Sequence, residues 1–368
     1  MKNEFNIIIS GGGTGGHIYP ALAIANKIKE LYPQANILFI GALGKMEMEK
    51  VPQAGYRIVG LPIAGWQRKD LIKNVTLPFK LLRCLRHAKK VIKEFKPNVV
   101  VGVGGYASAP TLWMAARLGI PCLLQEQNSI AGITNKFLAK KAKRVCVAYE
   151  GLERFFPKEK INLTGNPVRY TIVPADAEFS LKGRLFFNIG ITQKCLLVLG
   201  GSLGARALNE CVKAYIERTQ GDSPVDIIWQ CGAYYRNEIE AFVAAHPRPW
   251  LHLHPFINRM ELAYAAADVV VSRSGAGTVS ELCIAGKAVI FVPSPNVAED
   301  HQRFNALALV NQKAALMVPE EQALDHLMFE AIDLAYDLSI RERLERNITT
   351  LARPHAARDI VHEIVQWL

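Results

Sequence analysis

The chain has 368 residues, of which 50% are hydrophobic and 21% charged, with 44 Lys and Arg against 33 Asp and Glu and a formal net charge of +11. This is the composition of a globular protein, and the length predicts about two domains. The seven cysteines form no C-x-x-C pair, so we expect neither a disulfide framework nor a structural zinc site. The basic excess favours an anionic partner: nucleic acid, a phosphorylated metabolite or an acidic membrane face.

The apolar run before the first glycines is short for a signal peptide. The longest uncharged stretch, 97–116, is interrupted by several glycines and by Pro110, which favours a strand, loop and helix over a membrane span. We therefore expect a cytoplasmic protein without a transmembrane helix.

In chain order, short β-branched runs alternate with helical patterns such as 18–31. The runs are continuously apolar, which is typical of parallel strands covered on both faces. They predict strands at 6–10, 37–40, 99–103, 122–125, 144–147, 195–200, 227–230, 269–272 and 288–292. The fold class is therefore doubly wound α/β.

The two halves of the chain contain a weak internal repeat. The stretch 7–28 and the stretch 196–216 each contain a strand, a glycine turn and a helix, which predicts two Rossmann-like domains. The segment 162–182 lacks periodicity, so we place the linker there, with the boundary near residue 166. The C-terminal segment 340–368 is predicted to be helical, with a break near Pro354.

The first glycine turn, Gly11 to Gly16, follows the strand predicted at 6–10 and fits G-x-G-x-x-G. A nicotinamide dinucleotide site also needs a carboxylate at the end of the second strand, but that strand ends in Gly41 and Ala42. No Lys-Ser/Thr pair follows the glycines, so the turn is not a Walker A loop. Two interpretations remain: a turn that presents helix N-terminal amides to ligand oxygens, or glycines that serve only tight turning.

His17 lies in the first turn of the helix that follows. The positive end of a helix disfavours an imidazolium, and a neutral imidazole accepts protons near pH 7. His17 is therefore a candidate general base. The alternative is a polar ring that only hydrogen-bonds the backbone or a substrate.

Two glycine turns in the second half also precede helices. Ser202, in the first of them, either donates to a phosphate or caps its helix. In the second, SRSGAGTVSE (272–281), Thr278 and Glu281 match a capping box. The functional alternative places a phosphate on the amides of 276–278 and a ribose on Glu281.

A dense polar set, Gln125 to Asn128, follows another predicted strand. Such groups suit sugar hydroxyls, and a helix cap is the simpler alternative. No D-x-D pair lies between the halves, and no His/Cys cluster has metal-ligand spacing, so we expect no protein-bound metal. A diphosphate would then be neutralised by helix N-termini and by cations such as Arg169.

Residues 66–93 interleave basic and apolar side chains, which is typical of a membrane-interface segment. Nucleic acid is the rival partner, but single-strand binders stack bases on aromatic rings, and this segment has few of them. A solvated helix face is the third interpretation. The predicted membrane patch consists of Trp66, Lys69, Lys73, Val75, Phe79, Lys80, Leu82 and Arg83.

Taken together and in order, the motifs resemble those of the undecaprenyldiphospho-muramoylpentapeptide β-N-acetylglucosaminyltransferases of glycosyltransferase family 28. The resemblance covers nearly the whole chain and rests on GGTGGH (12–17), GVGGYASAP (102–110), EQNSIAGITNK (126–136), GNPVR (165–169), GGSLGAR (200–206), SRSGAGTVSE (272–281) and DHQRFNA (300–306). Two positions depart from the family pattern: Leu203 stands where Gln is usual, and Gln125 where His is common.

The resemblance implies a GT-B fold, with two Rossmann-like doubly wound parallel-sheet domains facing across a cleft. Residues 1–165 would form the N-terminal acceptor and membrane-side domain, and 166–349 the C-terminal UDP-GlcNAc-binding domain. The C-terminal helix, about 350–368, would pack back on the N-terminal domain.

The implied activity is inverting transfer of GlcNAc from UDP-GlcNAc to the C4 hydroxyl of MurNAc in the polyprenyl diphosphate acceptor lipid I. The product, lipid II, serves peptidoglycan synthesis, cell shape and division. The resemblance also implies a peripheral protein on the anionic cytoplasmic face of the inner membrane, without a cofactor and without nucleic acid as a partner.

The general base would be His17 or, alternatively, Glu126. Ile257 would contact uracil through its backbone, and Gln302 would meet the sugar hydroxyls. The positions that the resemblance assigns to substrate binding are Thr14, Gly15, Gly16, Asn128, Arg169, Ser202, Ile257, Ala276, Gly277, Thr278, Glu281 and Gln302.

Three other functions stay open at this point. Another glycosyltransferase of the same fold, such as one acting on diacylglycerol, would share the basic membrane patch. A nicotinamide-dependent oxidoreductase would need the missing ribose carboxylate. A basic membrane or nucleic-acid adaptor would bind polymer in a salt-sensitive way without donor turnover.

Overall fold

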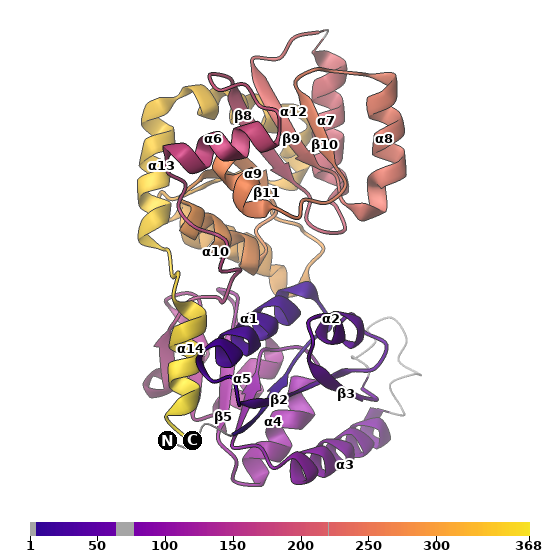
Figure 1. Ribbon diagram of the computed structural model, residues 1–368, viewed down its shortest axis with the longest axis vertical. Helices are drawn as coiled ribbons and strands as arrows, with labels where there is room; N and C mark the ends of the chain where they lie inside the picture. Colours follow the sequence, from indigo (N-terminus) through magenta and orange to yellow (C-terminus); the bar gives the residue numbers. More distant parts are fainter. Residues whose placement is uncertain (1–4, 64–76, 220) are drawn as a thin grey trace. The chain divides into compact units, whose positions relative to one another are not determined.

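The computed structural model describes residues 5–63, 77–219 and 221–368, with the backbone alone for 77–80 (Figure 1). The chain divides into two compact units, which we call unit 1 (Met1–Val168 with Arg353–Leu368) and unit 2 (Arg169–Ala352). Each unit is built on one parallel sheet with helices on its faces, as predicted for two Rossmann-like domains.

Unit 1 contains a seven-stranded parallel sheet in the order β3-β2-β1-β4-β5-β6-β7. The strands are β1 (Asn6–Ser10), β2 (Asn36–Ala42), β3 (Arg57–Leu61), β4 (Val99–Gly102), β5 (Cys122–Glu126), β6 (Arg144–Val147) and β7 (Ile161–Leu163). The helices are α1 (Gly15–Leu31), α2 (Glu47–Gln53), α3 (Leu77–Phe95), α4 (Ser108–Arg117), α5 (Ile133–Ala139) and α14 (Ala356–Val365).

Successive residues of β1 supply both cores of unit 1. Ile7 and Ile9 face a core formed with α1 and α14, whereas Ile8 faces a core formed with α3, α4 and α5. All three isoleucines are fully buried, because a parallel sheet covered on both faces leaves its central strand no contact with solvent. Full burial of such a side chain contributes about 1.5–3 kcal/mol.

The last helix, α14, belongs to unit 1, although the chain up to Ala352 belongs to unit 2. It lies beside α1 (Figure 1), and Ile360 and Ile364 are fully buried in their shared core. Glu363 fixes it to the sheet, accepting from Arg144 Nε at 2.7 Å and from Asn162 Nδ2 at 2.8 Å. The helical C-terminal segment and its break near Pro354 are confirmed by α13 and α14.

Unit 2 contains a six-stranded parallel sheet in the order β10-β9-β8-β11-β12-β13. Its strands are β8 (Lys194–Leu199), β9 (Val225–Gln230), β10 (Leu251–His254), β11 (Val269–Ser272), β12 (Ala288–Phe291) and β13 (Leu316–Met317). Its helices are α6 (Ala177–Phe186), α7 (Arg206–Arg218), α8 (Arg236–Ala245), α9 (Met260–Ala266), α10 (Ala276–Ala285), α11 (His301–Val310), α12 (Glu320–Tyr336) and α13 (Leu338–Thr350).

The predicted linker at 162–182 is wrong over part of its length. The side chain of Asp176 accepts a hydrogen bond from Phe179 N at 2.8 Å and so caps α6. This helix packs on α9, and Gly183 lies so close that a Cβ there would be 2.5 Å from the backbone oxygen of Leu262. The part of the segment in α6, residues 177–182, is therefore an integral part of unit 2.

Candidate functional site

The two sheets have the same strand order, apart from one extra strand in unit 1, and in each the order of successive strands reverses near the middle of the sheet. In unit 1 the reversal lies between β1 and β4, and in unit 2 between β8 and β11. Ligands of open α/β sheets bind outside the carboxyl ends of the strands at such switch points. The glycine turns singled out in the sequence follow β1, β8 and β11, so the fold places all three at these points.

The first glycine turn uses several of its own amides internally. The N–H of Gly11 donates to Ile40 O at 3.2 Å, that of Gly12 to Gly104 O at 3.3 Å, and that of Gly13 to Glu47 Oε2 at 2.9 Å. These three amides are directed at the protein and not at a ligand. Among the described residues, the amides of Thr14, Gly15 and Gly16 make no such backbone bond, which narrows the ligand-facing part of the turn to these three positions.

His17 is half-buried in the first turn of α1, and the loop before the helix fixes its ring. Its Nδ1 lies 3.1 Å from the carbonyl oxygen of Gly12 and 3.2 Å from the hydroxyl of Thr14. A carbonyl oxygen only accepts, so this contact favours the neutral tautomer with hydrogen on Nδ1, in which Nε2 is the proton acceptor. A Cβ added to Gly104 would lie 2.8 Å from Nε2, so this nitrogen faces the turn that follows β4.

Glu126, the alternative base, is only 2% exposed at the end of β5. Its oxygens accept from the backbone amides of Asn128 and Gly132 at 3.1 and 3.0 Å, and from Asn135 Nδ2 at 2.9 Å. Burial raises the pKa of its carboxyl, with these donors acting in the opposite sense. These contacts indicate that Glu126 stabilises the loop that follows β5.

The amide side chains next to Glu126 also bind groups within the protein. Gln125 donates to Asn166 Oδ1 at 2.9 Å, Asn166 donates to Gln127 O at 2.9 Å, and Gln127 donates to Val103 O at 2.8 Å. All three amide side chains are nearly fully buried, so their polar atoms serve this network and not a sugar. Within the predicted polar set, Asn128 alone is partly exposed.

In unit 2, the N-terminus of α10 has no side-chain cap. Gly275 is its N-cap, and its first turn contains no acidic residue. A Cβ at Gly275 or at Gly277 would have no described atom within 4 Å, and neither glycine has a positive φ. Packing and backbone conformation therefore do not require glycine here, whereas an anion approaching the amides of 276–278 would.

Glu281 does not form the capping box with Thr278 that its spacing permits. Its Oε1 accepts from Arg169 Nε at 2.9 Å and its Oε2 from the hydroxyl of Tyr264 at 3.0 Å. Burial and the adjacent carboxylate raise the pKa of Tyr264, which keeps it a donor. Each carboxylate oxygen has a second lone pair, so hydroxyl groups of a ligand can still donate to Glu281.

Arg169 opens unit 2, directly after the boundary found in the structure. Its side chain is half exposed while that of Glu281 is 10% exposed. The pair therefore places a cation at the surface with its carboxylate partner buried beneath it.

Gln302 is held by two hydrogen bonds, one to the turn before α10 and one to the loop after β12. Its backbone oxygen accepts from Ser274 Oγ at 2.8 Å, and its side-chain Oε1 accepts from Ser294 N at 2.9 Å. The two residues before α11, Glu299 and Asp300, have φ of +56° and +51°, which is strained for side chains other than glycine. The loop is thus held in place next to the N-terminus of α10.

The remaining residues predicted to contact the donor also lie at the carboxyl ends of the unit 2 strands. Ser202 is exposed in the turn after β8, and its carbonyl accepts from Ala233 N at 3.2 Å. Ile257 follows β10, and its side chain is 3% exposed. No backbone hydrogen bond is found for Ile257 within the described part of the chain.

The predicted membrane patch lies mostly outside what the structure describes. Trp66, Lys69, Lys73 and Val75 fall outside the described residues, as do the side chains of Phe79 and Lys80. Leu82 is 45% exposed on α3. The adjoining part of α3 lines a basic pocket of about 450 Å³ with Leu43, Pro62, Arg83, Arg86, His87 and Lys90.

Membrane-spanning helices and metal-ligand clusters are both absent from the described ranges. No helix in 5–63, 77–219 or 221–368 is both long and apolar enough to cross a bilayer. Over the same ranges, no three His, Cys, Asp or Glu side chains come together as a metal site would need.

Two residues at these sites, Glu47 and Tyr264, were not predicted from the sequence. Glu47 lies five positions after the strand end at which a carboxylate was sought, and it folds back so that Oε1 accepts from Ala42 N at 2.9 Å. The sequence signal that could have identified Glu47 is an acidic residue at the start of the helix after β2. Tyr264 lies on α9, and nothing in its local pattern distinguishes it from an ordinary core tyrosine.

Comparisons with known proteins agree with this architecture. Residues 7–147 match the glycosyltransferase family 28 N-terminal domain and 195–362 the family 28 C-terminal domain. A protein of Parabacteroides distasonis is 52% identical over 99% of this chain and 98% of its own, and is named UDP-N-acetylglucosamine--N-acetylmuramyl-(pentapeptide) pyrophosphoryl-undecaprenol N-acetylglucosamine transferase. A protein of Porphyromonas gingivalis with the same name is 48% identical over 100% of this chain and 98% of its own.

Among solved structures, Acinetobacter baumannii MurG superposes with a TM-score of 0.78 at 30% identity, covering 98% of this chain and 99% of its own. The calicheamicin glycosyltransferase CalG4 superposes with a TM-score of 0.67 at 16% identity, covering 99% of this chain and 98% of its own, which bears on the fold alone. The two-domain GT-B prediction is confirmed by these matches and by the two sheets. The chain belongs to glycosyltransferase family 28.

Proposed function

We propose that this protein transfers GlcNAc from UDP-GlcNAc to the C4 hydroxyl of MurNAc in undecaprenyl-diphospho-MurNAc-pentapeptide, with inversion at the anomeric carbon. The observation that carries the proposal is the 52% identity, over 99% of the chain, to a relative whose name states the donor, the acceptor and the transfer of N-acetylglucosamine. A diacylglycerol acceptor, a nicotinamide cofactor and a non-catalytic adaptor have no comparable support.

The carboxyl edge of the unit 2 sheet suits the donor. The N-terminus of α10, which no side chain caps, would present backbone N–H groups and a positive helix end to the diphosphate. Arg169, held by Glu281, adds a positive charge that stabilises the UDP leaving group as its negative charge develops. Ser202, Ile257 and Gln302 would contact the remainder of the donor.

The carboxyl edge of the unit 1 sheet suits the acceptor hydroxyl. His17 Nε2 would take the C4 proton as the hydroxyl oxygen attacks the anomeric carbon and the bond to the diphosphate breaks. The geometry favours His17 over Glu126, because the oxygens of Glu126 are buried and already accept from the loop around them. We infer no role for a protein-bound metal.

We also propose that the protein acts at the anionic face of the inner membrane as a peripheral protein. The described part of α3 supports this, because Arg83, Arg86 and Lys90 line a pocket beside exposed Leu82. Sedimentation with phosphatidylglycerol vesicles tests it. We expect binding that weakens as salt rises, and undiminished binding of an Arg83→Glu/Arg86→Glu variant would contradict it.

The direct test of the transfer is incubation with UDP-[14C]GlcNAc and a synthetic lipid I analogue, followed by mass analysis of the product. We expect a β-1,4-linked disaccharide on the lipid carrier. Release of UDP without a disaccharide product, or transfer to diacylglycerol in preference to the analogue, would refute the proposal.

A further inference from the structure

The peptide group between Gly12 and Gly13 is held by a side chain at each end. Its N–H donates to Oε2 of Glu47 at 2.9 Å, and its carbonyl oxygen lies 3.1 Å from Nδ1 of His17. The second oxygen of Glu47 accepts from the backbone N–H of Ala42 at 2.9 Å. Glu47 is 1% exposed, so this carboxylate is shielded from solvent.

The space that Glu47 fills is left by two glycines. A Cβ added to Gly12 would lie 2.2 Å from Glu47 Oε1, and one added to Gly41 would lie 2.5 Å from Glu47 Cγ. Gly12 also has a φ of +147°, which side chains rarely permit. The turn is therefore shaped around the carboxylate.

A carboxylate bound to a peptide N–H polarises that peptide and makes its carbonyl a stronger acceptor. Here the strengthened acceptor is the oxygen that faces Nδ1 of His17. It favours the tautomer with hydrogen on Nδ1, whereas the hydroxyl of Thr14, at 3.2 Å, serves either tautomer. Once Nε2 has taken a proton, the same carbonyl stabilises the imidazolium that forms.

We propose that Glu47 is a positioning residue for His17. Acting through the Gly12–Gly13 peptide, it holds the ring with hydrogen on Nδ1 and so presents Nε2 as the proton acceptor. The catalytic meaning of this relay rests on the proposed function, whereas the tautomer itself does not.

The first test is on the unmodified full-length protein. With 15N-labelled histidine, two-dimensional NMR at pH 8 distinguishes the two neutral tautomers, and a His17→Ala variant assigns the signals. We expect His17 to carry hydrogen on Nδ1. Hydrogen on Nε2 would overturn the proposal before Glu47 is changed at all.

The second test replaces the carboxylate by an amide of the same shape. In Glu47→Gln one of the two backbone N–H groups faces an NH2 group, so both bonds cannot form. We expect kcat to fall about tenfold or more, while KM for UDP-GlcNAc changes less than about twofold, because the variant impairs proton transfer and not donor binding. The His17 signals should shift toward a mixture of tautomers.

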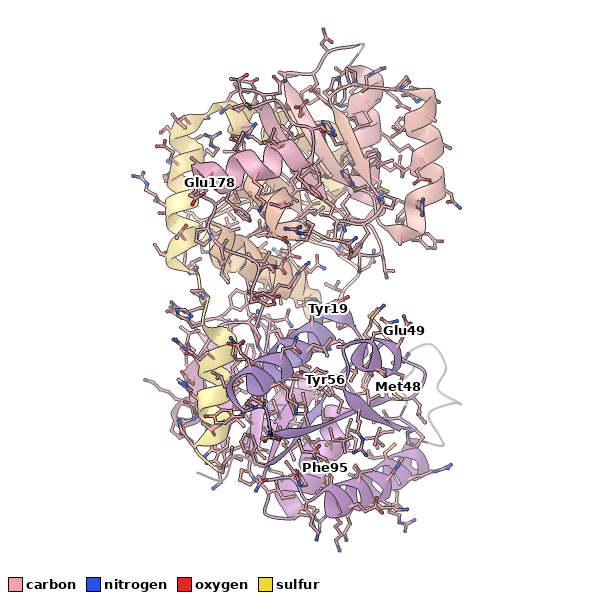
Figure 2. The ribbon with its side chains drawn as sticks, viewed as in Figure 1. Tyr19, Met48, Glu49, Tyr56, Phe95 and Glu178 are labelled. Carbon is pink, nitrogen blue, oxygen red and sulfur yellow. The ribbon has the colours of Figure 1, made fainter. Side chains whose placement is uncertain are left out.

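The matched control is Glu49→Gln on the same helix, where the side chain lies on the exposed surface (Figure 2) and pairs with Lys50 at 3.1 Å. It should leave kcat and the His17 tautomer unchanged. A Glu47→Gln variant that retains the tautomer or the wild-type kcat would overturn the relay. Failure of the wild type to form the disaccharide would instead refute the proposed function, and the NMR experiment would still decide the tautomer.

Discussion

Replacing Gly277 by Ala should stabilise the protein and weaken nucleotide binding at the same time. A Cβ at this second position of α10 meets no described atom within 4 Å, so it brings no steric penalty within the protein. Ala is favoured over Gly in a helix by up to about 1 kcal/mol. For a domain of this size, that corresponds to a rise in Tm of about 2–4 °C.

The same methyl group occupies the space in front of the helix N-terminus. If the diphosphate of UDP contacts these amides, the methyl displaces one or two charge-assisted hydrogen bonds, each contributing about 1.5–3 kcal/mol. The Kd for UDP should therefore rise at least about tenfold. Calorimetric unfolding and titration calorimetry on the same preparations measure both effects.

The control is Asn237→Ala, at the second position of α8, where the side chain is exposed. It should raise stability slightly through helix propensity and leave the affinity for UDP unchanged. A Gly277→Ala protein that binds UDP as tightly as the wild type would refute the placement of the diphosphate at α10.

Three other predictions concern the base, a pH effect and metal ions. His17→Ala should lower turnover by about 10²–10⁴-fold with UDP affinity unchanged, and an unaltered kcat would remove His17 from the chemistry. Burial lowers the pKa of His252 and His254, so the unfolded chain binds more protons and stability should fall as the pH drops below about 6.5. Thermal unfolding between pH 7.5 and 5.5 measures this, and a His252→Gln/His254→Gln double variant that declines as steeply would contradict it. Transfer to the lipid I analogue should persist in EDTA, whereas full loss that added Mg²⁺ restores would show that a divalent ion is required.

The strands predicted from sequence and those missed differ in their place in the sheet. The pattern of continuous apolar residues identified every interior strand, such as β1 and β11, because these strands are covered on both faces. It missed β3, β7, β10 and β13, which are the four edge strands. Each is only partly buried, and β10 reads Leu-His-Leu-His, so the signal that the pattern detects is absent there.

The parts of the candidate site that lie in one local motif could be predicted from the sequence. The contacts between residues distant in the sequence could not. The turn before α10 could be placed from the glycines and from the strand that precedes it. The contact of Glu281 with Arg169 could not be predicted, because the two residues are far apart in the sequence and come together only when unit 2 folds. The spacing of Thr278 and Glu281 instead pointed to a capping box. That box does not form, because the N-cap of α10 is Gly275, three residues before Thr278.

The most direct test of the account is a crystal structure of the protein with UDP-GlcNAc bound. We predict the diphosphate on the amides of 276–278, with Arg169 beside it and the uracil against the backbone of Ile257. A nucleotide bound instead at the first glycine turn of unit 1, with α10 making no contact with phosphate, would contradict the account.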